Sequence, residues 1–479
     1  MPKPCKIKTI KNALTVSRME QIMSSTFNPL PRINPANVVA ELEAEREAHA
    51  GTRARLKLLE HTVLQFVPRD LISFLGKGSL LDVELGDQVE KTMSIVFTDI
   101  RDFTTLSESM TPQQTFNMIN SYLSVMNPVI STHQGIIDKY MGDAIMALFP
   151  TLADDALSAA LAMLARLDEY NNGRSRAAYP PIKIGIGVNT GLLMLGVIGG
   201  GNRMEGTVIS HAVNLASRLE TLTKTYGVPL LISEHTLYSL SDSERFSIRY
   251  LGRSKVAENT PAESVYEVFD HDAPEIRGLK AKSLKKFEEA LAYYHLRAAA
   301  KALPMLEEIV LENPGDNPAK VYLKRCGDYI KTGIFIGTEE LADEMIWRKK
   351  HEVGIEEIDR QLQELLDLIQ KLHEAVTVEN SQNAITSAMD ILEKRIREHF
   401  EFEDELMIKH NYLFSSDHIA QHNSYKKYFH KLREEIEANI EKSLYLGFRI
   451  NLSLSNWLLN HVSRDDRHLG RFLSDCGCV

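Results

Sequence analysis

Two aspartates at the ends of strand-like segments constrain this chain more than any other feature. Asp99 follows the apolar run MSIVF (93–97), and a turn and a helix-like start come after it. Asp143 lies in the turn Met141-Gly142-Asp143 between two apolar, β-prone segments, a pattern that predicts a hairpin. Carboxylates at strand ends, beside a loop whose amides can face phosphates, suit divalent cations that hold a nucleoside triphosphate.

A third motif lies downstream, in GNRMEGTVISHAVNLASRLE (201–220). Asn214 and Arg218 are four residues apart in a segment with helical apolar spacing, so they share one helix face. With FTDIRDFT and DKYMGDAIM before it, the stretch from about residue 90 to 270 resembles the class III nucleotidyl cyclase catalytic domain. That resemblance implies an α+β ferredoxin-like fold with βαββαβ at its centre. It also implies active sites that form between two such domains.

The resemblance implies a role for each matching position. Asp99, Ile100 and Asp143 would hold two Mg²⁺ or Mn²⁺ ions, and Lys139 and Thr207 would select the purine. Lysine can donate to adenine N1 and threonine can accept from the exocyclic amine, whereas guanine would call for an acceptor such as Glu at position 139. ATP is therefore the expected substrate, with a guanylate cyclase as the alternative.

Asn214 and Arg218 would position the ribose and stabilise charge on the phosphate in the transition state, as the resemblance implies. A guanidinium offers forked donors that match phosphate oxygens. All six principal side-chain positions are filled, which implies a homodimer with two sites. Two departures affect the loops: Ser210-His211 replaces a glycine-containing pair, and residues 254–257 replace a VKG turn.

Composition excludes several function classes. The chain has 479 residues, 44% of them hydrophobic and 25% charged, as in an ordinary globular protein of about three domains. A formal charge of −10 argues against a nucleic-acid partner, and no apolar run approaches the ~20 residues of a membrane span. Four scattered cysteines and the lack of a secretory signal favour the cytoplasm, with Cys476 and Cys478 as an inert tail rather than a redox or metal pair.

The flanking segments are helical in pattern. Residues 1–35 are expected to be a flexible lead, and 36–68 to be either one amphipathic helix packed on the cyclase domain or a short parallel coiled coil. The cyclase domain is expected at 69–271. Residues 272–339 resemble a tetratricopeptide-like helical hairpin with a further helix, which cannot bury its apolar face alone and must pack on a neighbour.

The last segment, 340–479, is rich in histidine. Nine of the sixteen histidines lie at or after residue 351, so some are expected to be ligands. Amphipathic stretches with short connections predict a four-helix bundle, with helices at about 354–376, 380–408, 415–439 and 444–472.

Four motifs in this segment resemble the hemerythrin family, whose bundles hold a non-haem di-iron centre that binds dioxygen. They are VGIEEIDRQ (353–361), HFEFEDELM (399–407), HIAQH (418–422) and WLLNHVSRDD (457–466). The resemblance implies six iron ligands in this chain: His399, Glu403, His418, His422, His461 and Asp466.

The spacing of these ligands suits a shared interior. His399 and Glu403 are four residues apart, as are His418 and His422, which places each pair on one helix face. Asp466 is five residues after His461, a spacing that an α-helix does not place on one face.

One departure concerns the first motif. The family's I-D-x-Q-H ends here in Leu362, and leucine cannot ligate iron. The resemblance leaves the three-histidine iron of His418, His422 and His461 intact. The loss of one imidazole leaves three alternatives for the centre. It would be a di-iron site completed by water, a site with a single iron, or a site with altered redox behaviour.

Three hypotheses follow. The first is an adenylate cyclase tuned by a C-terminal di-iron sensor of oxygen, redox state or iron. The second is a non-catalytic oxygen or iron binder with a relict cyclase scaffold. The third is a guanylate cyclase. Turnover by the full chain separates the first two, and competition between ATP and GTP decides the third.

Overall fold

The computed structural model describes most of the chain after residue 68 and parts of the preceding segment. The described residues are 46, 49–59, 62–63, 69–200, 203–255, 262–295, 297–335, 347, 349–375, 382–438, 454, 457–458 and 461–477. The chain forms two compact units, residues 1–67 and residues 68–479.

In the first unit, residues 49–59 are helical, which confirms a helix within the segment 36–68. Leu56 and Leu59 are 59% and 61% exposed within a single chain. The choice between a coiled coil and a packed helix therefore stays open. The predicted flexible lead, residues 1–35, lies outside the described residues.

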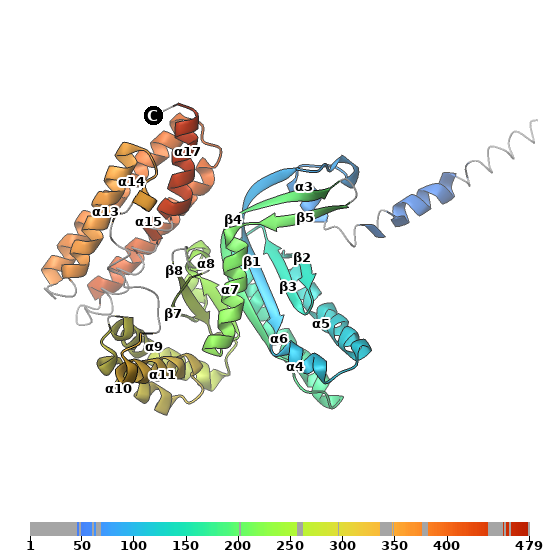
Figure 1. Cartoon of the computed structure of the whole chain (residues 1–479), viewed down its shortest axis with the longest axis horizontal. Helices are drawn as coiled ribbons and strands as arrows, with labels where there is room; N and C mark the ends of the chain where they lie inside the picture. The colour runs from blue at the N-terminus through green and yellow to red at the C-terminus, as the bar shows by residue number, and fades with distance from the viewer. Residues whose placement is uncertain are drawn as a thin grey trace, which may run out of the picture. The chain divides into compact units, whose positions relative to one another are not determined.

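The second unit is built on one mixed β-sheet (Figure 1). Its strands are β1 (Gln88–Ile100), β2 (Ile136–Met141), β3 (Ala144–Phe149), β4 (Ile184–Gly200), β5 (Arg203–Ile209), β6 (Leu230–Ser233), β7 (Ile248–Lys255) and β8 (Ala262–Val268). Their order across the sheet is β2-β3-β1-β4-β6-β8-β7, and β5 pairs with β4. The pair β4–β6 is parallel, and the other strand pairs among the described residues are antiparallel.

The first four strands alternate with two long helices, α5 (Pro112–Thr132) and α6 (Ala153–Arg176), as β1-α5-β2-β3-α6-β4. This order confirms the expected α+β fold. Alternate residues of β1 face opposite sides of the sheet. Val96 and Ile100 belong to the core that α5 and α6 cover. Ile95 and Phe97 face the other way, toward the first turns of α7 (His211–Tyr226).

Glycines in β4 let α7 approach the sheet closely. A Cβ atom at Gly187 would lie 2.3 Å from the backbone oxygen of Ala216 in α7. The helix therefore rests directly on the strand, and a side chain at residue 187 would push it away.

Three helices follow the sheet: α9 (Pro274–His295), α10 (Ala299–Glu312) and α11 (Asn317–Thr332). Their apolar faces share a core with α7, β6, β7 and β8, so the prediction that this segment packs on a neighbour is confirmed. A buried charge network joins them to the sheet. Arg249 of β7 donates to Glu267 at 2.6 Å and twice to Asp316 at 2.7 Å, and Lys280 of α9 donates to Glu267 at 2.6 Å. Breaking one partner of such a network would leave a buried charge uncompensated.

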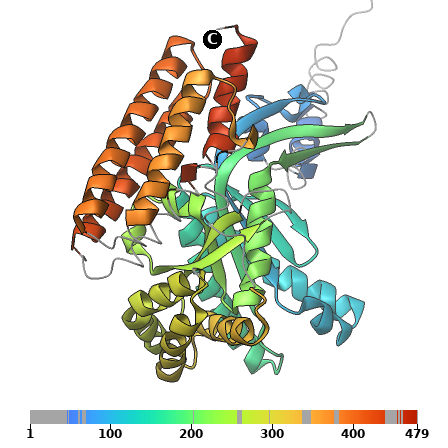
Figure 2. The ribbon, with the colours of Figure 1, turned by 60° about the vertical axis from the view of Figure 1, so that its left-hand side comes forward.

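The C-terminal region is all-helical (Figures 1 and 2). It contains α13 (Glu356–Glu374), α14 (Gln382–Lys409), α15 (Ser415–Ala438), the π-helical turn η6 (Val462–Asp466) and α17 (Arg467–Asp475), here called the C-terminal bundle. The first three helices lie within two residues of the predicted ranges. The fourth predicted stretch, 444–472, falls partly outside the described residues, and its helix continues to Asp475 rather than ending at 472.

The remaining helices and turns of the second unit are short. They are the helices α3 (Arg69–Phe74), α4 (Phe103–Glu108) and α8 (Glu234–Ser239), and the 3₁₀ turns η1 (Leu80–Asp82), η2 (Ser243–Arg245) and η3 (Lys349–His351). No helix in the described ranges is long and apolar enough to cross a bilayer. Cys476 is disulfide-bonded, whereas Cys326 is buried and free.

Candidate active site and candidate metal centre

Asp99 and Asp143 meet at one edge of the sheet. Asp99 is the penultimate residue of β1, and Asp143 follows Gly142, whose φ of +70° forms the β2–β3 turn. The pairing of Thr98 with Ile145 brings the two strand ends side by side. The Ile100 amide donates to the Asp143 carboxylate at 3.3 Å. The predicted juxtaposition of Asp99, Ile100 and Asp143 is therefore present.

The two carboxyl groups strongly influence each other. Partial burial, a hydrogen bond that protonated Asp143 donates to Asp99, and the charge of Asp99 together raise the pKa of Asp143 to about 7. Two carboxylates held this close repel each other unless a proton or a cation lies between them. Hard divalent cations prefer such oxygen ligands, so the donor set fits Mg²⁺ or Mn²⁺.

The predicted purine-selecting residues also meet. Lys139 on β2 donates to the Thr207 hydroxyl on β5 at 3.2 Å, although 68 residues separate them in sequence. Lys139 also lies 3.5 Å from the carboxylate of Asp138, and Thr207 is buried. The pair presents one ammonium donor and one hydroxyl at a single place on the sheet.

Asn214 and Arg218 lie on α7, one turn apart, and both are exposed. Within one chain, no hydrogen bond or ion pair among the described residues joins them to the aspartates or to the Lys139–Thr207 pair. The six predicted positions thus form three separate groups, each on an ordered element.

The start of α7 shows how Ser210 replaces the family's glycine-containing pair. Ser210 is the N-cap, with a φ of −167°, an extended conformation that any residue adopts. Its hydroxyl oxygen accepts from the Ala212 amide at 3.0 Å and donates to the Leu192 carbonyl at 2.6 Å. The helix therefore begins normally without glycine. For the second departure, residues 256 and 257 lie outside the described part of the chain.

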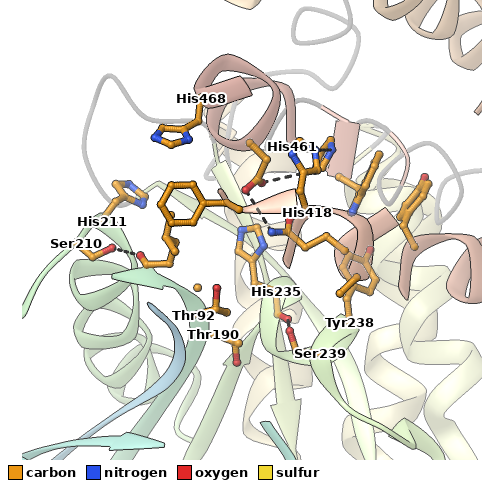
Figure 3. A pocket seen from close by; sticks show the side chains of 18 of the residues that line it. Thr92, Thr190, Ser210, His211, His235, Tyr238, Ser239, His418, His461 and His468 are labelled. Carbon is orange, nitrogen blue, oxygen red and sulfur yellow. Dashed lines mark hydrogen bonds and ion pairs between the residues drawn. The ribbon is translucent and has the colours of Figure 1, made fainter. Parts of the chain in front are cut away.

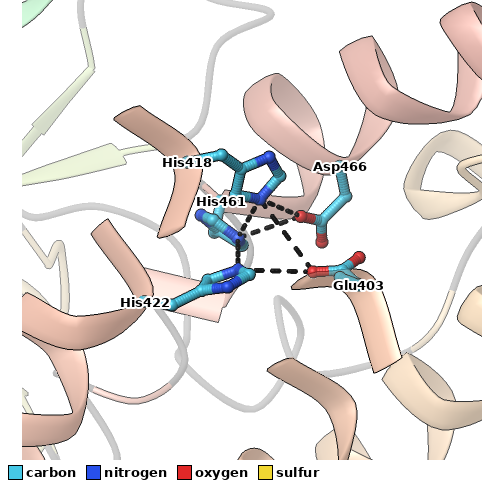
Figure 4. Close-up of side chains that lie close together, drawn as sticks. All are labelled: Glu403, His418, His422, His461 and Asp466. Atoms are coloured by element: carbon cyan, nitrogen blue, oxygen red, sulfur yellow. Dashed lines mark hydrogen bonds and ion pairs between the residues drawn. The ribbon is translucent and has the colours of Figure 1, made fainter. Parts of the chain in front are cut away.

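A second group of chemistry-bearing residues lies inside the C-terminal bundle. Five buried side chains converge so that one ligand atom of each lies within 4.8 Å of all the others. Figure 4 shows them pointing toward one another from α14, α15 and the π-helical turn with the residue before it. They are Glu403, His418, His422, His461 and Asp466.

Short distances link these side chains. The Nε2 atom of His461 lies 3.0 Å from the Nε2 atoms of both His418 and His422, and 2.9 Å from an oxygen of Asp466. The Nε2 atom of His422 lies 3.3 Å from Glu403. Three imidazole nitrogens and two carboxylates facing one point match the ligand types of a transition-metal site.

The π-helical turn explains the five-residue spacing of His461 and Asp466. A π-helix repeats at i→i+5, so Val462–Asp466 rotates Asp466 onto the face of His461. In a regular α-helix Asp465 would take that place. Here Asp465 lies instead 3.5 Å from the Nδ1 atom of His461, on the far side of the ring from the cluster.

The sixth predicted ligand, His399, lies at the border of this cluster. Its Nε2 atom is 3.7 Å from Glu403, and its Nδ1 atom is 3.0 Å from the side-chain oxygen of Gln361 on α13. Leu362, next to Gln361, is fully buried in the apolar core. The five-residue group does not include His399. The structure therefore brings five of the six predicted ligands into one group and places the sixth beside it.

The charges of the cluster are compatible with a bound cation. Burial raises the pKa of Glu403 well above its ordinary value, and the negative charge of Asp466 raises it further. Burial alone would lower the pKa of His461, but the charge and hydrogen bonds of Asp466 and Asp465 raise it well above the ordinary value. Within the described residues, both oxygens of Glu403 and the Nε2 atom of His399 have no hydrogen-bond partner. A metal ion would satisfy these atoms.

Sequence reasoning missed the residues that orient the imidazoles. Asp404 lies 2.8 Å from the Nδ1 atom of His422, and Gln361 holds His399 as described. The ring of Phe400 stacks on His422 at 4.0 Å, and Trp457 stacks on His461 at 4.5 Å. Asp404 lies in the motif HFEFEDELM and Gln361 in the motif VGIEEIDRQ. Only the packing of the helices shows that each reaches a histidine ring.

A cavity of about 450 Å³ adjoins the cluster and the sheet domain (Figure 3). The bundle contributes His418, His461 and the aromatic ring of Trp457 to its wall. The sheet domain contributes Thr190 of β4 and Ser210, the cap of α7. The His, Glu and Asp cluster and the start of α7 therefore face the same cavity.

Comparison with known proteins identifies the sheet domain. Residues 86–267 match the family described as Adenylate and Guanylate cyclase catalytic domain. "Adenylate cyclase, terminal-differentiation specific" of Dictyostelium discoideum is 34% identical over 293 residues, 59% of this chain and 14% of that protein. "Adenylate cyclase" of Anabaena cylindrica is 41% identical over 220 residues, 45% of this chain and 44% of that protein.

A third relative, "Adenylate cyclase 1" of Rhizobium meliloti (strain 1021), is 29% identical over 233 residues, 47% of this chain and 34% of that protein. The matched regions thus span less than half the length of each of these three relatives. The C-terminal bundle is a helical region with a buried cluster of His, Glu and Asp side chains that could bind a metal. Residues 86–267, with Asp99 and Asp143 at the edge of their sheet, form a class III adenylate and guanylate cyclase catalytic domain.

Proposed function

We propose that this protein is an adenylate cyclase that converts ATP to 3′,5′-cyclic AMP and pyrophosphate, and that its C-terminal bundle is an iron-binding, hemerythrin-like regulator. The observation that carries the catalytic part is the meeting of Asp99 and Asp143 at the β1 end and the β2–β3 turn. The names of the relatives support the same activity.

The reaction forms one bond and breaks another at the same phosphorus. The ribose 3′-oxygen attacks the α-phosphorus and loses its proton, and the bond from the α-phosphorus to the bridging oxygen of the pyrophosphate breaks. Mg²⁺ or Mn²⁺ bound by Asp99, Ile100 and Asp143 would supply activation of the attacking oxygen and neutralise the developing charge.

The remaining residues bind and orient the nucleotide. Asn214 holds the ribose, and Arg218 donates to the phosphate oxygens as negative charge grows on them. Lys139 donates to adenine N1, and Thr207 accepts from the exocyclic amine. Their 3.2 Å contact supports a shared base pocket, because both groups already face one place.

We infer that the working enzyme is a homodimer with two composite sites. One protomer would supply Asp99 and Asp143, and its partner the other four side chains. The exposed face of α7 that carries Asn214 and Arg218 supports this arrangement, since both polar side chains are open to contact from a second protomer.

The regulatory part rests on the buried cluster in the C-terminal bundle. Its five side chains are ligand types that suit iron, and the Glu403 oxygens, which have no hydrogen-bond partner among the described residues, could bind a cation. An iron centre there would respond to dioxygen, to another small ligand or to redox state. Because Leu362 cannot ligate a metal, the bundle would hold either one or two irons, and metal analysis would give the number.

Steady-state assays of the full chain test the catalytic proposal. Purified protein with Mg²⁺ or Mn²⁺ should form cyclic AMP from ATP faster than cyclic GMP from GTP, and Asp99→Asn should abolish both reactions. A preference for GTP would make the protein a guanylate cyclase. Absence of turnover with either nucleotide, in folded and dimeric protein, would make the domain a relict scaffold.

A further inference from the structure

The short helix α8 joins the C-terminal bundle to the sheet domain. The ring of Tyr238 on α8 lies 4.5 Å from the ring of Tyr428 on α15 and packs against the apolar core of the bundle. Its hydroxyl donates to the buried carboxyl of Glu234 at 2.6 Å. The helix α15 also carries His418 and His422 of the metal cluster. A shift of α15 would therefore reach α8 directly.

Beneath α8, a buried chain of hydrogen bonds runs to α7. Ser233, the N-cap of α8, accepts from the Thr236 amide at 3.1 Å and donates to the Asn189 side-chain oxygen at 2.6 Å. The Asn189 amide then donates to the backbone oxygen of Ala212 in α7 at 2.9 Å. Ser233, Thr236 and Asn189 are all fully buried. Because water cannot replace these bonds, the chain holds α8 and α7 at a fixed spacing.

The chain of hydrogen bonds ends at Ala212, which is close in sequence to Asn214 and Arg218. Ala212 lies in the first turn of α7, two residues before Asn214 and six before Arg218. The first turn also begins at Ser210, which lines the cavity beside His418 and His461 (Figure 3). A small displacement of this turn would move both side chains that face the nucleotide, and catalysis is sensitive to such shifts.

We propose that Asn189 is a positioning residue for Asn214 and Arg218, and that the Tyr428–Tyr238 contact and Ser233 link it to the C-terminal bundle. This inference rests on the proposed function, since it specifies how the bundle controls the cyclase. Asn189 touches neither nucleotide nor metal in this account. It acts through the backbone of α7.

A double-variant cycle on the full chain tests the link. Tyr428→Ala removes the ring contact, and Asn189→Ala removes both side-chain hydrogen bonds. Each change should lower kcat for ATP by about two- to tenfold, the range for one lost buried hydrogen bond or one lost aromatic contact, with KM nearly unchanged. Because both act along one chain, the double variant should be no slower than the slower single variant.

Matched controls separate the link from general damage. Tyr428→Phe keeps the ring, and Lys427→Ala changes an exposed neighbour on the same helix, so both should keep the kcat of the unmodified protein. If Asn189→Ala does not fold, Ser233→Ala takes its place, since it loses the bond to Asn189. Multiplied effects in the double variant, or a change confined to KM, would overturn the inference.

Amide hydrogen exchange at residues 211–218 gives a readout that needs neither turnover nor iron. Tyr428→Ala and Asn189→Ala should both speed exchange there, and Tyr428→Phe should not. Unchanged exchange in both variants would also refute the link. An iron-free bundle with the expected exchange pattern would instead contradict the metal proposal and leave the link standing. Absence of cyclase activity with that pattern would contradict only the catalytic proposal.

Discussion

At the scale of single residues, each candidate site depends on side chains that are far apart in sequence and close in space. Lys139 and Thr207 are joined at 3.2 Å across 68 residues, and Asp99 faces Asp143 across the sheet edge. His461 and Asp466 are joined at 2.9 Å across a π-helical turn. In each case a backbone element fixes the pair before any ligand binds, so the effect of a substitution can be predicted from the chemistry of the side chain.

The purine preference should follow the Lys139–Thr207 pair. Lys139→Glu combined with Thr207→Cys replaces a donor by an acceptor and should lower the use of ATP while raising that of GTP. A mispaired buried polar group costs roughly 1–3 kcal/mol, so the ratio of kcat/KM values should shift by about tenfold or more. Competition assays with both nucleotides measure this ratio. An unchanged ratio would show that neither residue contacts the base.

Leu362 should limit the metal content of the bundle. Leu362→His would add an imidazole next to Gln361, which already orients His399, and should raise the iron bound per chain after anaerobic reconstitution. Leu362→Met is the matched control, because it keeps the apolar volume and adds no imidazole. Metal analysis gives the stoichiometry, and thermal unfolding with and without iron shows whether the added histidine binds it. Equal iron content in all three proteins would place residue 362 outside the metal site.

At the scale of elements, the sequence predicted what local patterns determine. The β2–β3 hairpin follows from a Gly-Asp turn between apolar segments, and the shared face of Asn214 and Arg218 follows from their i, i+4 spacing. The π-helical turn could not be predicted from the residues alone, because tertiary packing decides between i+4 and i+5 spacing. The contact of Tyr238 with Tyr428 was equally hidden, since nothing near either residue indicates which helix it meets.

The stability of the α8 region should depend on pH. Burial is the main cause that raises the pKa of Glu234 to about 8 from an ordinary value of 4.5. The hydrogen bond from Tyr238 and the charge of Arg253 lower it, whereas Glu263 raises it. A carboxyl group with a raised folded-state pKa favours folding when it is protonated. Its contribution is complete below about pH 4.5 and is lost as the pH rises through about 8.

Glu234→Gln should remove the loss of folding stability that ionisation of Glu234 causes at high pH. The Tm of the variant relative to the unmodified protein should rise by a few degrees between about pH 5 and about pH 8.5. Thermal unfolding across this range, followed by circular dichroism, measures the difference. A difference that is constant or falls with pH would mean that Glu234 is already ionised in the folded protein.

At the scale of the whole molecule, α7 links the parts of the second unit. Its C-terminal end meets α11, where Asn317 donates to the Gly227 carbonyl at 3.0 Å and Tyr322 stacks on Tyr226. Its N-terminal turn is held by Asn189 of β4 and capped by Ser210, which lines the cavity beside the His, Glu and Asp cluster. The helix that presents Asn214 and Arg218 is thus held by α11 at one end and by the sheet at the other.

Composite active sites should reveal themselves by complementation. Asp99→Ala and Arg218→Ala should each abolish cyclase activity in a homodimer. A mixed dimer would contain one site with both residues intact, so mixing should restore up to about half the activity of the unmodified dimer per heterodimer. Differently tagged chains allow the heterodimer to be purified and assayed. Purified heterodimers that stay inactive would contradict the composite arrangement.

The most direct test of the central claim is the cyclase rate of iron-loaded full-length protein in two states of its metal centre. The same preparation is assayed with saturating ATP after anaerobic reduction and after oxidation in air, with optical spectra recorded on both samples. We expect stoichiometric iron and rates that differ by about 5- to 150-fold, the range of an ordinary coupling free energy. His422→Ala, which removes a ligand, should bring the two rates together. Equal rates in two spectroscopically distinct iron states would contradict the claim that the C-terminal bundle regulates the cyclase.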